Sequence, residues 1–187
     1  MTAVLTIEKA THDMSGVTFT DATHEYDGTE KVLEIGGVLP EGVSVTYENN
    51  RGTDAGTYPA VAKFEVADPE NYNLIPDMTA TLTITKKAGT IVITNKDALS
   101  KIYNGEAVSE PIIETTGDGA VTVEYYVGSE ASGDVLETAP VNVGTYTVKV
   151  ILEETNNYMG ATDSATFEIT KATYDMSGIT FTDATYP

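Results

Sequence analysis

Acidic and amide side chains gather in one kind of loop that occurs twice in the sequence. The residues concerned are Asp68, Glu70 and Asn71 in the first copy, and Glu153, Glu154 and Asn156 in the second. Hard cations such as calcium are bound by carboxylate, amide and carbonyl oxygens. Neither loop has the spacing of an EF-hand. We therefore name these six residues as calcium candidates, beside the plainer interpretation that the loops are solvated acidic turns, and we expect no other cofactor.

Tyrosine offers a second kind of chemistry, because its ring stacks on sugars and proteins while its hydroxyl forms hydrogen bonds. Tyr125 and Tyr126 are adjacent, and we expect one or both to be exposed near a loop tip. They are therefore the candidate ligand-binding residues. Tyr72 and Tyr158 occupy equivalent positions in the two acidic loops, and this recurrence favours a role in the fold.

Catalytic chemistry is poorly represented. His12 and His24 are the only histidines, and a later copy of the same segment has Tyr174 and Tyr186 in their places. No GxSxG, P-loop or HExxH pattern is present. Adjacent acids are expected by chance in so acidic a chain. The sequence therefore predicts no catalytic residue and a protein that is not an enzyme.

The composition narrows the possible partners. The 29 acidic and 10 basic residues give a net charge of −19, which disfavours nucleic acids and anionic membranes because both are bound through clustered Lys and Arg. The absence of Cys excludes disulfides and thiolate zinc sites. No apolar run approaches the roughly 20 residues of a membrane span, so no membrane insertion is expected.

The elements that must position these residues are predicted to be β-strands. Apolar and polar residues alternate with a period of two in several segments, which is typical of half-buried strands. These segments are 43–47, 57–66, 79–85, 121–127 and 145–151. Gly, Asn, Asp and Pro separate them, as expected for turns. An insertion at 128–134 is expected to be a hairpin tip, and no amphipathic helix is found.

The chain is organised as tandem repeats. Residues 9–23 return at 171–185 with two differences, and a second segment recurs with its final Lys at 9, 86 and 171. Such self-similarity is the signature of a repeat architecture. We divide the chain into residues 1–9, the last strand of a preceding repeat; 10–86, the first repeat; 87–171, the second repeat; and 172–187, the first strand of a following repeat.

Three tyrosine landmarks recur in both repeats. They are Tyr26-Asp-Gly-Thr29 and Tyr103-Asn-Gly-Glu106, Asp54-Ala-Gly-Thr-Tyr58 and Asn142-Val-Gly-Thr-Tyr146, and Asn71-Tyr-Asn73 and Asn157-Tyr-Met159. The second landmark resembles the D-x-G-x-Y tyrosine corner of immunoglobulin-like domains. The missing Cys pair and Trp depart from antibody-type domains, so only the sandwich architecture is suggested.

The order of the landmarks, ending in a Thr-rich strand with Ile-Thr-Lys, is similar to the MBG or YGX-type tandem repeats of bacterial cell-surface proteins. This resemblance covers nearly the whole chain. It implies two immunoglobulin-like β-sandwich modules in an extracellular array on an adhesin-like protein of the cell surface or cell wall. The alternative fold is a β-grasp, which would require a helix.

The sequence is compatible with two functions. In the first, the repeats are a structural stalk or spacer whose partners are neighbouring repeats of the same chain. In the second, they are an adhesive module that binds a host glycan, mucin or matrix protein. Unpaired strands recruit partners through their open backbone groups, so residues 1–9 and 173–187 are also predicted to pair between copies of the chain.

Overall fold

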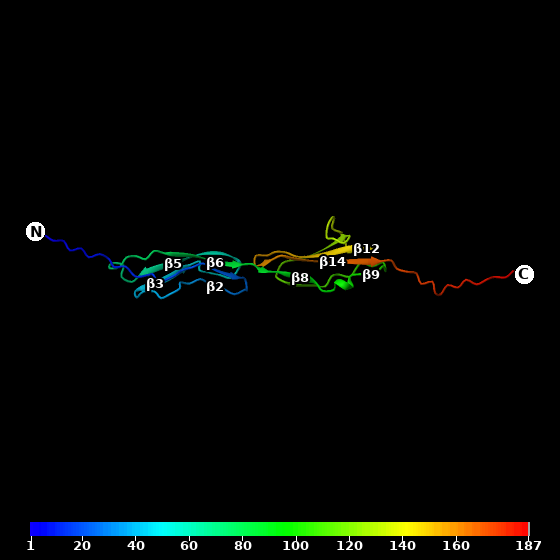
Figure 1. Ribbon diagram of the computed structural model, residues 1–187, viewed down its shortest axis with the longest axis horizontal. Helices are drawn as coiled ribbons and strands as arrows, with labels where there is room; N and C mark the ends of the chain where they lie inside the picture. Colours follow the sequence, from blue (N-terminus) through cyan, green and yellow to red (C-terminus); the bar gives the residue numbers. More distant parts are fainter. Residues whose placement is uncertain (187) are drawn as a thin grey trace. The chain divides into compact units, whose positions relative to one another are not determined.

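The structure is a computed structural model that describes residues 1–186 (Figure 1). The described residues form two compact units. The first comprises Met1–Ala88 together with Thr155–Met159, and the second comprises Gly89–Glu154 and the chain from Gly160 onward. Each unit is built from β-strands, and the described part of the chain contains no α-helix, only one short 3₁₀ turn, η1 (Lys96–Ala98). No helix among these residues is long and apolar enough to cross a membrane.

The first unit is organised around a four-stranded sheet with the order β1-β6-β5-β3. Its strands are β1 (Ala22–Glu25), β3 (Val43–Glu48), β5 (Gly56–Val66) and β6 (Met78–Thr85), and the smaller ladders of the unit use β2 (Lys31–Val32), β4 (Arg51–Gly52), β7 (Lys87–Ala88) and β13 (Tyr158–Met159). Strand β5 runs antiparallel to β3 and β6, whereas β1 runs parallel to β6. The buried side chains of this sheet pack against Val17, Phe19 and Leu33, which lie outside it.

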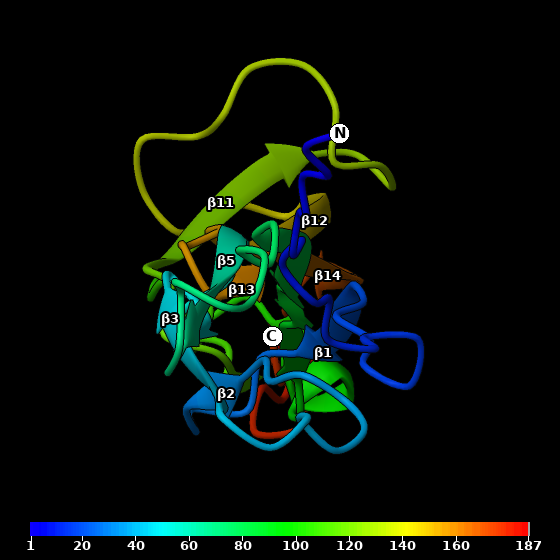
Figure 2. The same cartoon turned by 90° about the vertical axis from the view of Figure 1, so that its left-hand side faces the viewer.

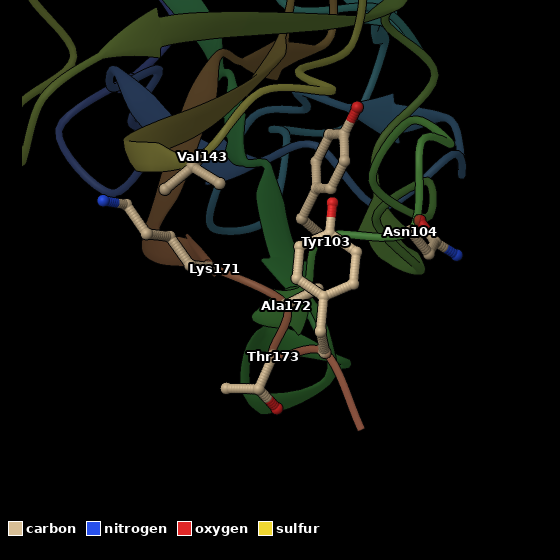
Figure 3. A pocket seen from close by; sticks show the side chains of 7 residues that line it. Tyr103, Asn104, Val143, Lys171, Ala172 and Thr173 are labelled. Atoms are coloured by element: carbon tan, nitrogen blue, oxygen red, sulfur yellow. The ribbon is translucent and has the colours of Figure 1, made fainter. Parts of the chain in front are cut away.

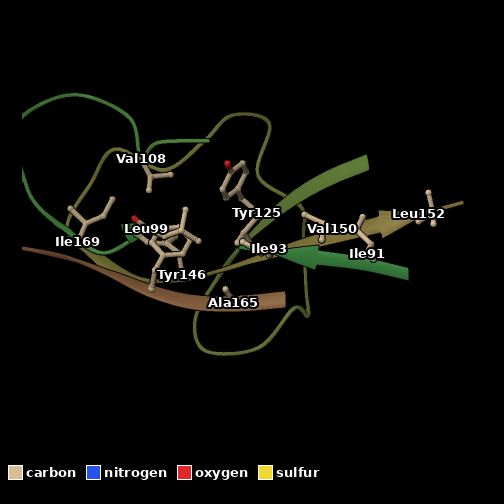
Figure 4. Close-up of a cluster of buried hydrophobic side chains, with 12 residues drawn as sticks. Ile91, Ile93, Leu99, Val108, Tyr125, Tyr146, Val150, Leu152, Ala165 and Ile169 are labelled. Carbon is tan, nitrogen blue, oxygen red and sulfur yellow. The ribbon is translucent and has the colours of Figure 1, made fainter. Parts of the chain in front are cut away.

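The second unit repeats this plan with the sheet order β11-β12-β14-β9. Its strands are β8 (Thr90–Ile93), β9 (Lys101–Ile102), β10 (Ile113–Thr116), β11 (Val121–Val127), β12 (Gly144–Leu152) and β14 (Ala161–Thr170). Strand β9 is parallel to the last strand β14, as β1 is to β6. The pair β8–β10 supplies Ile91 and Ile93 to a core shared with the larger sheet (Figure 4).

The alternation seen in the sequence accounts for these layers. In β14 the buried side chains are Ala165, Phe167 and Ile169, with exposed residues between them. This period of two places one face of the strand on the core and the other in water. The strands predicted from alternation are confirmed by β3, β5, β6, β11 and β12, and the all-β sandwich is confirmed. The described residues provide no helix for the β-grasp alternative.

Two parts of the described chain lie outside the sheets. The insertion at 128–134 is part of the wide loop that joins β11 to β12 (Figure 2). Residues 1–9 and 173–186 are exposed and form no strand in the described chain. A strand requires a neighbouring ladder, and neither segment has one there. Pro187 lies outside the described residues, and the assignment of 1–9 and 172–187 to neighbouring repeats stays a prediction.

Candidate functional site

Both repeats contain a tyrosine that is tied back to the turn before its own strand. The Tyr58 hydroxyl donates a hydrogen bond to the Asp54 carbonyl oxygen at 2.8 Å, and the Tyr146 hydroxyl donates to the Asn142 carbonyl oxygen at 3.0 Å. This i to i−4 geometry is the tyrosine corner of immunoglobulin-like sandwiches. The corner predicted from the sequence is therefore confirmed, and it fixes the turn that precedes β5 or β12.

The first unit contains an arrangement in which a lysine-led linker holds an Asn-Tyr loop. Lys9 Nζ donates to the Pro69 carbonyl oxygen at 2.6 Å. The Ala10 amide donates to the Asn71 carbonyl oxygen at 2.8 Å, and Ala10 and Tyr72 form a parallel bridge. The His12 ring stacks on the Tyr72 ring with a centroid distance of 4.3 Å. Backbone pairing, a charged donor and ring stacking thus act together on one loop.

The same unit contains this arrangement a second time, built from the next linker and the segment Thr155–Met159. Lys86 Nζ donates to the Thr155 carbonyl oxygen at 2.8 Å. The Lys87 amide donates to the Asn157 carbonyl oxygen at 2.9 Å, and β7 pairs in parallel with β13. Thr155 stands two residues before Asn157, as Pro69 stands before Asn71, so the two arrangements correspond atom for atom along the backbone.

Side chains add specificity to this second arrangement. Asn157 Oδ1 accepts a hydrogen bond from the Ala55 amide at 2.8 Å, and Asn157 Nδ2 donates to Asp54 Oδ1 at 3.0 Å. The Tyr158 ring meets the Tyr26 ring edge-on, with centroids 5.5 Å apart. Three landmarks that looked independent in the sequence therefore meet at one place. All three landmarks recur with the same order in both repeats, and this was the signal in the sequence that could have indicated a contact among them. The contact was not predicted from the sequence.

The second unit has a hollow where its own copies of two of these landmarks lie beside the linker residues from Lys171 onward (Figure 3). Its volume is about 470 Å³, and its lining residues are Tyr103, Asn104, Val143, Lys171, Ala172, Thr173 and Tyr174. Exposure is 41 % for Tyr103, 43 % for Val143 and 95 % for Tyr174. Apolar and aromatic groups thus face water beside a lysine at this end of the unit.

The structure places Tyr125 and Tyr126 differently from our expectation. Their exposures are 8 % and 7 %, so the prediction that one or both are exposed near a loop tip is wrong. Both lie within β11, where Tyr125 packs edge-on against Phe167 and the Tyr126 hydroxyl donates to Glu124 Oε2 at 2.6 Å. Successive strand residues point to opposite faces, so both faces of β11 are covered here. Burial, aided by the negative charge of Glu110, raises the pKa of Tyr125.

The calcium candidates are divided between the units. In the first unit, Asp68 accepts hydrogen bonds from the Asn71 side chain at 2.9 Å and from its amide at 3.3 Å. The side-chain bond is the main cause that lowers the pKa of Asp68. Glu70 lies exposed in the same loop. This geometry makes the Asp68 carboxylate a cap for its own turn.

In the other loop, Glu153 and Glu154 belong to the second unit, whereas Asn156 lies in the segment assigned to the first. Asn156 Nδ2 donates to Asn157 Oδ1 at 3.3 Å. Across the part of the chain that the structure describes, no three His, Cys, Asp or Glu side chains are grouped so that they could hold a metal ion. Calcium binding by these residues stays a prediction.

One ion pair is integrated into the second unit's fold. Lys96 Nζ lies 2.7 Å from Asp163 Oδ1, and the Ile93 amide donates to Asp163 Oδ2 at 2.9 Å. Partial burial favours the neutral form of Asp163, but the hydrogen bonds from Ile93, Lys96 and Ser164 outweigh it and lower the pKa of Asp163. The carboxylate thus ties β8 and η1 to β14.

The fold and the repeated landmarks define a tandem array of immunoglobulin-like β-sandwich modules without disulfides. The chain belongs to the MBG domain family, whose pattern matches residues 15–88 and again residues 90–173. The family predicted from the sequence is therefore confirmed. None of the curated proteins with which the sequence was compared matches it.

Several solved structures are similar at low identity. One is BT4661, a SusE-like surface-located polysaccharide-binding protein of Bacteroides thetaiotaomicron, with 12% identity, a TM-score of 0.30, and coverage of 82% of this chain and 33% of that one. Another is Drosophila N-cadherin EC1-4, with 12% identity, a TM-score of 0.30 and coverage of 81% and 48%. The fibronectin(III)-like modules of Clostridium thermocellum CbhA show 15% identity, a TM-score of 0.30 and coverage of 83% and 94%. The chain thus spans a third to a half of the first two proteins.

Proposed function

We propose that this chain is a non-catalytic stretch of structural repeats that serves as a spacer in a bacterial cell-surface protein. Membership of the MBG domain family supports the surface location, because the landmarks of this sequence are those of repeats on bacterial surface proteins. The observation that carries the spacer role is the repeated holding of an Asn-Tyr loop by a lysine-led linker. The recurring lysines and the recurring Asn-Tyr loops thus bind each other, and each contact joins a linker to a loop more than 50 residues away.

The geometry of the linker supports this role. Lys86 and Lys87 follow β6 directly, and Lys87 already belongs to the next ladder. A linker whose backbone is paired has fewer accessible conformations than a flexible one. The Lys86 ammonium adds a charge-assisted hydrogen bond to the Thr155 carbonyl oxygen, and such bonds are stronger than neutral ones. A spacer requires this restriction, since a freely jointed chain collapses to a short mean length.

The charge of the chain is consistent with the same role. The net charge of −19 keeps the surface solvated and makes neighbouring repeats repel one another. Repulsion between units that are joined by short linkers opposes back-folding. It also disfavours non-specific association with anionic cell surfaces at low ionic strength.

The spacer role is tested by the distribution of distances across the linker. Because the chain lacks Cys, Cys introduced at the exposed strand positions Ser44 and Thr122 can be spin-labelled uniquely, and pulsed electron paramagnetic resonance then gives the distance distribution. We expect a narrow distribution that broadens in Lys86→Met. The matched control is Lys87→Met, which removes the same charge from an exposed neighbour and should leave the width unchanged. A distribution that is equally broad in all three proteins would contradict the proposal.

The adhesive alternative makes a different prediction. A spacer gives no saturable binding to mucins, matrix proteins or glycans, either with calcium or with a chelator. Saturable binding to one of these would replace the spacer role with an adhesive one, and its dependence on calcium would show whether the two acidic loops take part.

A further inference from the structure

We propose that the hollow in the second unit lined by Tyr103, Val143 and Lys171 is a docking site for the Asn-Tyr loop of a following MBG repeat. This inference rests on the proposed function, since it treats the chain as part of an array. It assigns a specific partner to a surface that is open in this chain. The partner is a loop with an Asn-Tyr pair, whose backbone carbonyl two residues before the Asn is available as an acceptor.

Most of the lining residues have a counterpart that already holds such a loop in the first unit. By the recurring landmarks, Tyr103 corresponds to Tyr26, and Val143 corresponds to Ala55. The linker residues Lys171 and Ala172 correspond to Lys86 and Lys87, and equally to Lys9 and Ala10. The hollow therefore presents the same positions as the occupied site, in the same order along the chain.

The counterparts specify the contacts that the incoming loop would make. The Val143 amide would donate to the Asn side-chain oxygen, as Ala55 does to Asn157. The ring of Tyr103, which is 41 % exposed, would receive the incoming Tyr ring edge-on, as Tyr26 receives Tyr158. Burying such aromatic area is favourable, and an edge-on pair of rings adds a further attraction.

The linker would supply the remaining contacts. Lys171 Nζ would donate to the loop carbonyl, as Lys9 and Lys86 both do. Tyr174 stands where His12 stands in the first copy of the segment. The His12 ring stacks on Tyr72, so Tyr174, which is 95 % exposed, is positioned in sequence to stack on the incoming Tyr. The Ala172 amide would donate to the backbone carbonyl of the incoming Asn, as the Ala10 and Lys87 amides do. All five predicted contacts thus have an observed precedent in the first unit.

A following repeat is a better occupant than a second copy of this chain. In the first unit, the loop containing Asn71 and Tyr72 is already paired with Ala10 and stacked on His12. A second copy would have to release these contacts before it could offer the loop. A following repeat has no such cost, because residues 171–185 repeat 9–23 and so form the matching linker themselves.

The test extends the chain by one repeat without altering any lining residue. Residues 1–185 are kept and are continued with a copy of residues 24–88, which is in register because 185 corresponds to 23. Amide hydrogen exchange is then measured by NMR at Val143 and Ala172. We expect exchange at both amides to slow at least tenfold relative to the original chain. Equal exchange rates in the two proteins would overturn the proposal.

Variants of the appended repeat show whether its loop is the cause. Asn71→Ala together with Tyr72→Ala in that repeat should return both exchange rates to those of the original chain. The neighbouring exposed residue Glu70 provides the control, since Glu70→Ala should keep the protection. Protection that survives the double substitution would mean that another surface covers the hollow and would overturn the proposal. Sedimentation of the original chain tests the other occupant: a dimer in which Val143 is protected would favour a second copy and would overturn the proposal.

The spacer role does not depend on these results. If amide exchange at Val143 and Ala172 stays fast while the spin-label distance distribution across Lys86 is narrow, the docking site is refuted and the spacer role stands. A broad distribution across Lys86 would refute the spacer role while leaving protection of the hollow to be judged separately.

Discussion

Removing one hydroxyl from each tyrosine corner should have unequal effects in the two units. Tyr146 is 9 % exposed, and its hydroxyl reaches the Asn142 carbonyl oxygen from a partly buried position. Tyr58 makes the same contact in an exposed setting. A net hydrogen bond contributes about 1 kcal/mol, and a carbonyl left buried without its partner costs about 1–3 kcal/mol. Tyr146→Phe should therefore cost about 2 kcal/mol, and Tyr58→Phe about 1 kcal/mol or less because water can replace the lost donor.

Two substitutions of Tyr146 separate the contribution of its hydroxyl from that of its ring. The Tyr146 ring stacks on Phe167 with centroids 5.9 Å apart, and this contact survives in Tyr146→Phe. Tyr146→Ala also removes the ring and should cost about 3–5 kcal/mol, as other truncations of buried aromatics do. The difference between the two variants measures the ring's packing.

The assay is urea and thermal unfolding of the full chain, with hydrogen exchange followed by mass spectrometry to assign each transition to a unit. A loss of 1 kcal/mol lowers the Tm of a domain of 60–100 residues by about 4–8 °C, so Tyr146→Phe should lower the transition of the second unit by about 8–16 °C. Equal losses from Tyr58→Phe and Tyr146→Phe, or a loss that appears in the wrong unit, would refute the reasoning.

Three further substitutions test the core, a turn and an ion pair. Leu82→Ala, at a residue with 0 % exposure, should lower the free energy of unfolding of the first unit by about 2–5 kcal/mol, measured from the urea midpoint. Gly37→Ala should cost more than about 1–2 kcal/mol, because φ is 90° there and a Cβ would collide with the Gly16 carbonyl, whereas Gly178→Ala, which meets no atom, should be neutral in the same assay. The pKa of Asp163 is lower in the folded state, so its stabilisation is present above the unfolded pKa of about 3.9 and is lost as the pH falls through the folded value. Asp163→Asn should accordingly show a smaller loss of stability between pH 7 and pH 3 than the unchanged chain, and an identical loss would contradict this role.

The strands were predictable because their signal is local. The alternation in 57–66 states both that the segment is a strand and which residues face inward, and the structure buries Ala60, Ala62 and Phe64 accordingly. The tyrosine corners were predictable for a similar reason, since hydroxyl and carbonyl are only four residues apart. Contacts between residues this close in sequence depend little on the rest of the chain.

The wrong prediction for Tyr125 and Tyr126 shows what alternation cannot supply. Alternation in β11 predicts that either Tyr125 or Tyr126 faces away from the core. Whether that second face meets water depends on what covers it, and the alternation carries no information about the cover. The structure buries both rings. The same limit applied to Asn157, whose partners Asp54 and Ala55 are more than 100 residues away.

The parallel pairing of β1 with β6, and of β9 with β14, has a mechanical consequence. A load that draws β1 toward the start of the chain and β6 toward its end acts along the ladder, so the hydrogen bonds from Ala22–Leu82 to Glu25–Thr85 resist in shear and must rupture together. Peeling a hairpin would instead break them one at a time. Force-ramp pulling should therefore show a high rupture force for the first unit that falls when His24→Pro removes a ladder donor. The force at which each module unfolds is then set by one short pair of parallel strands.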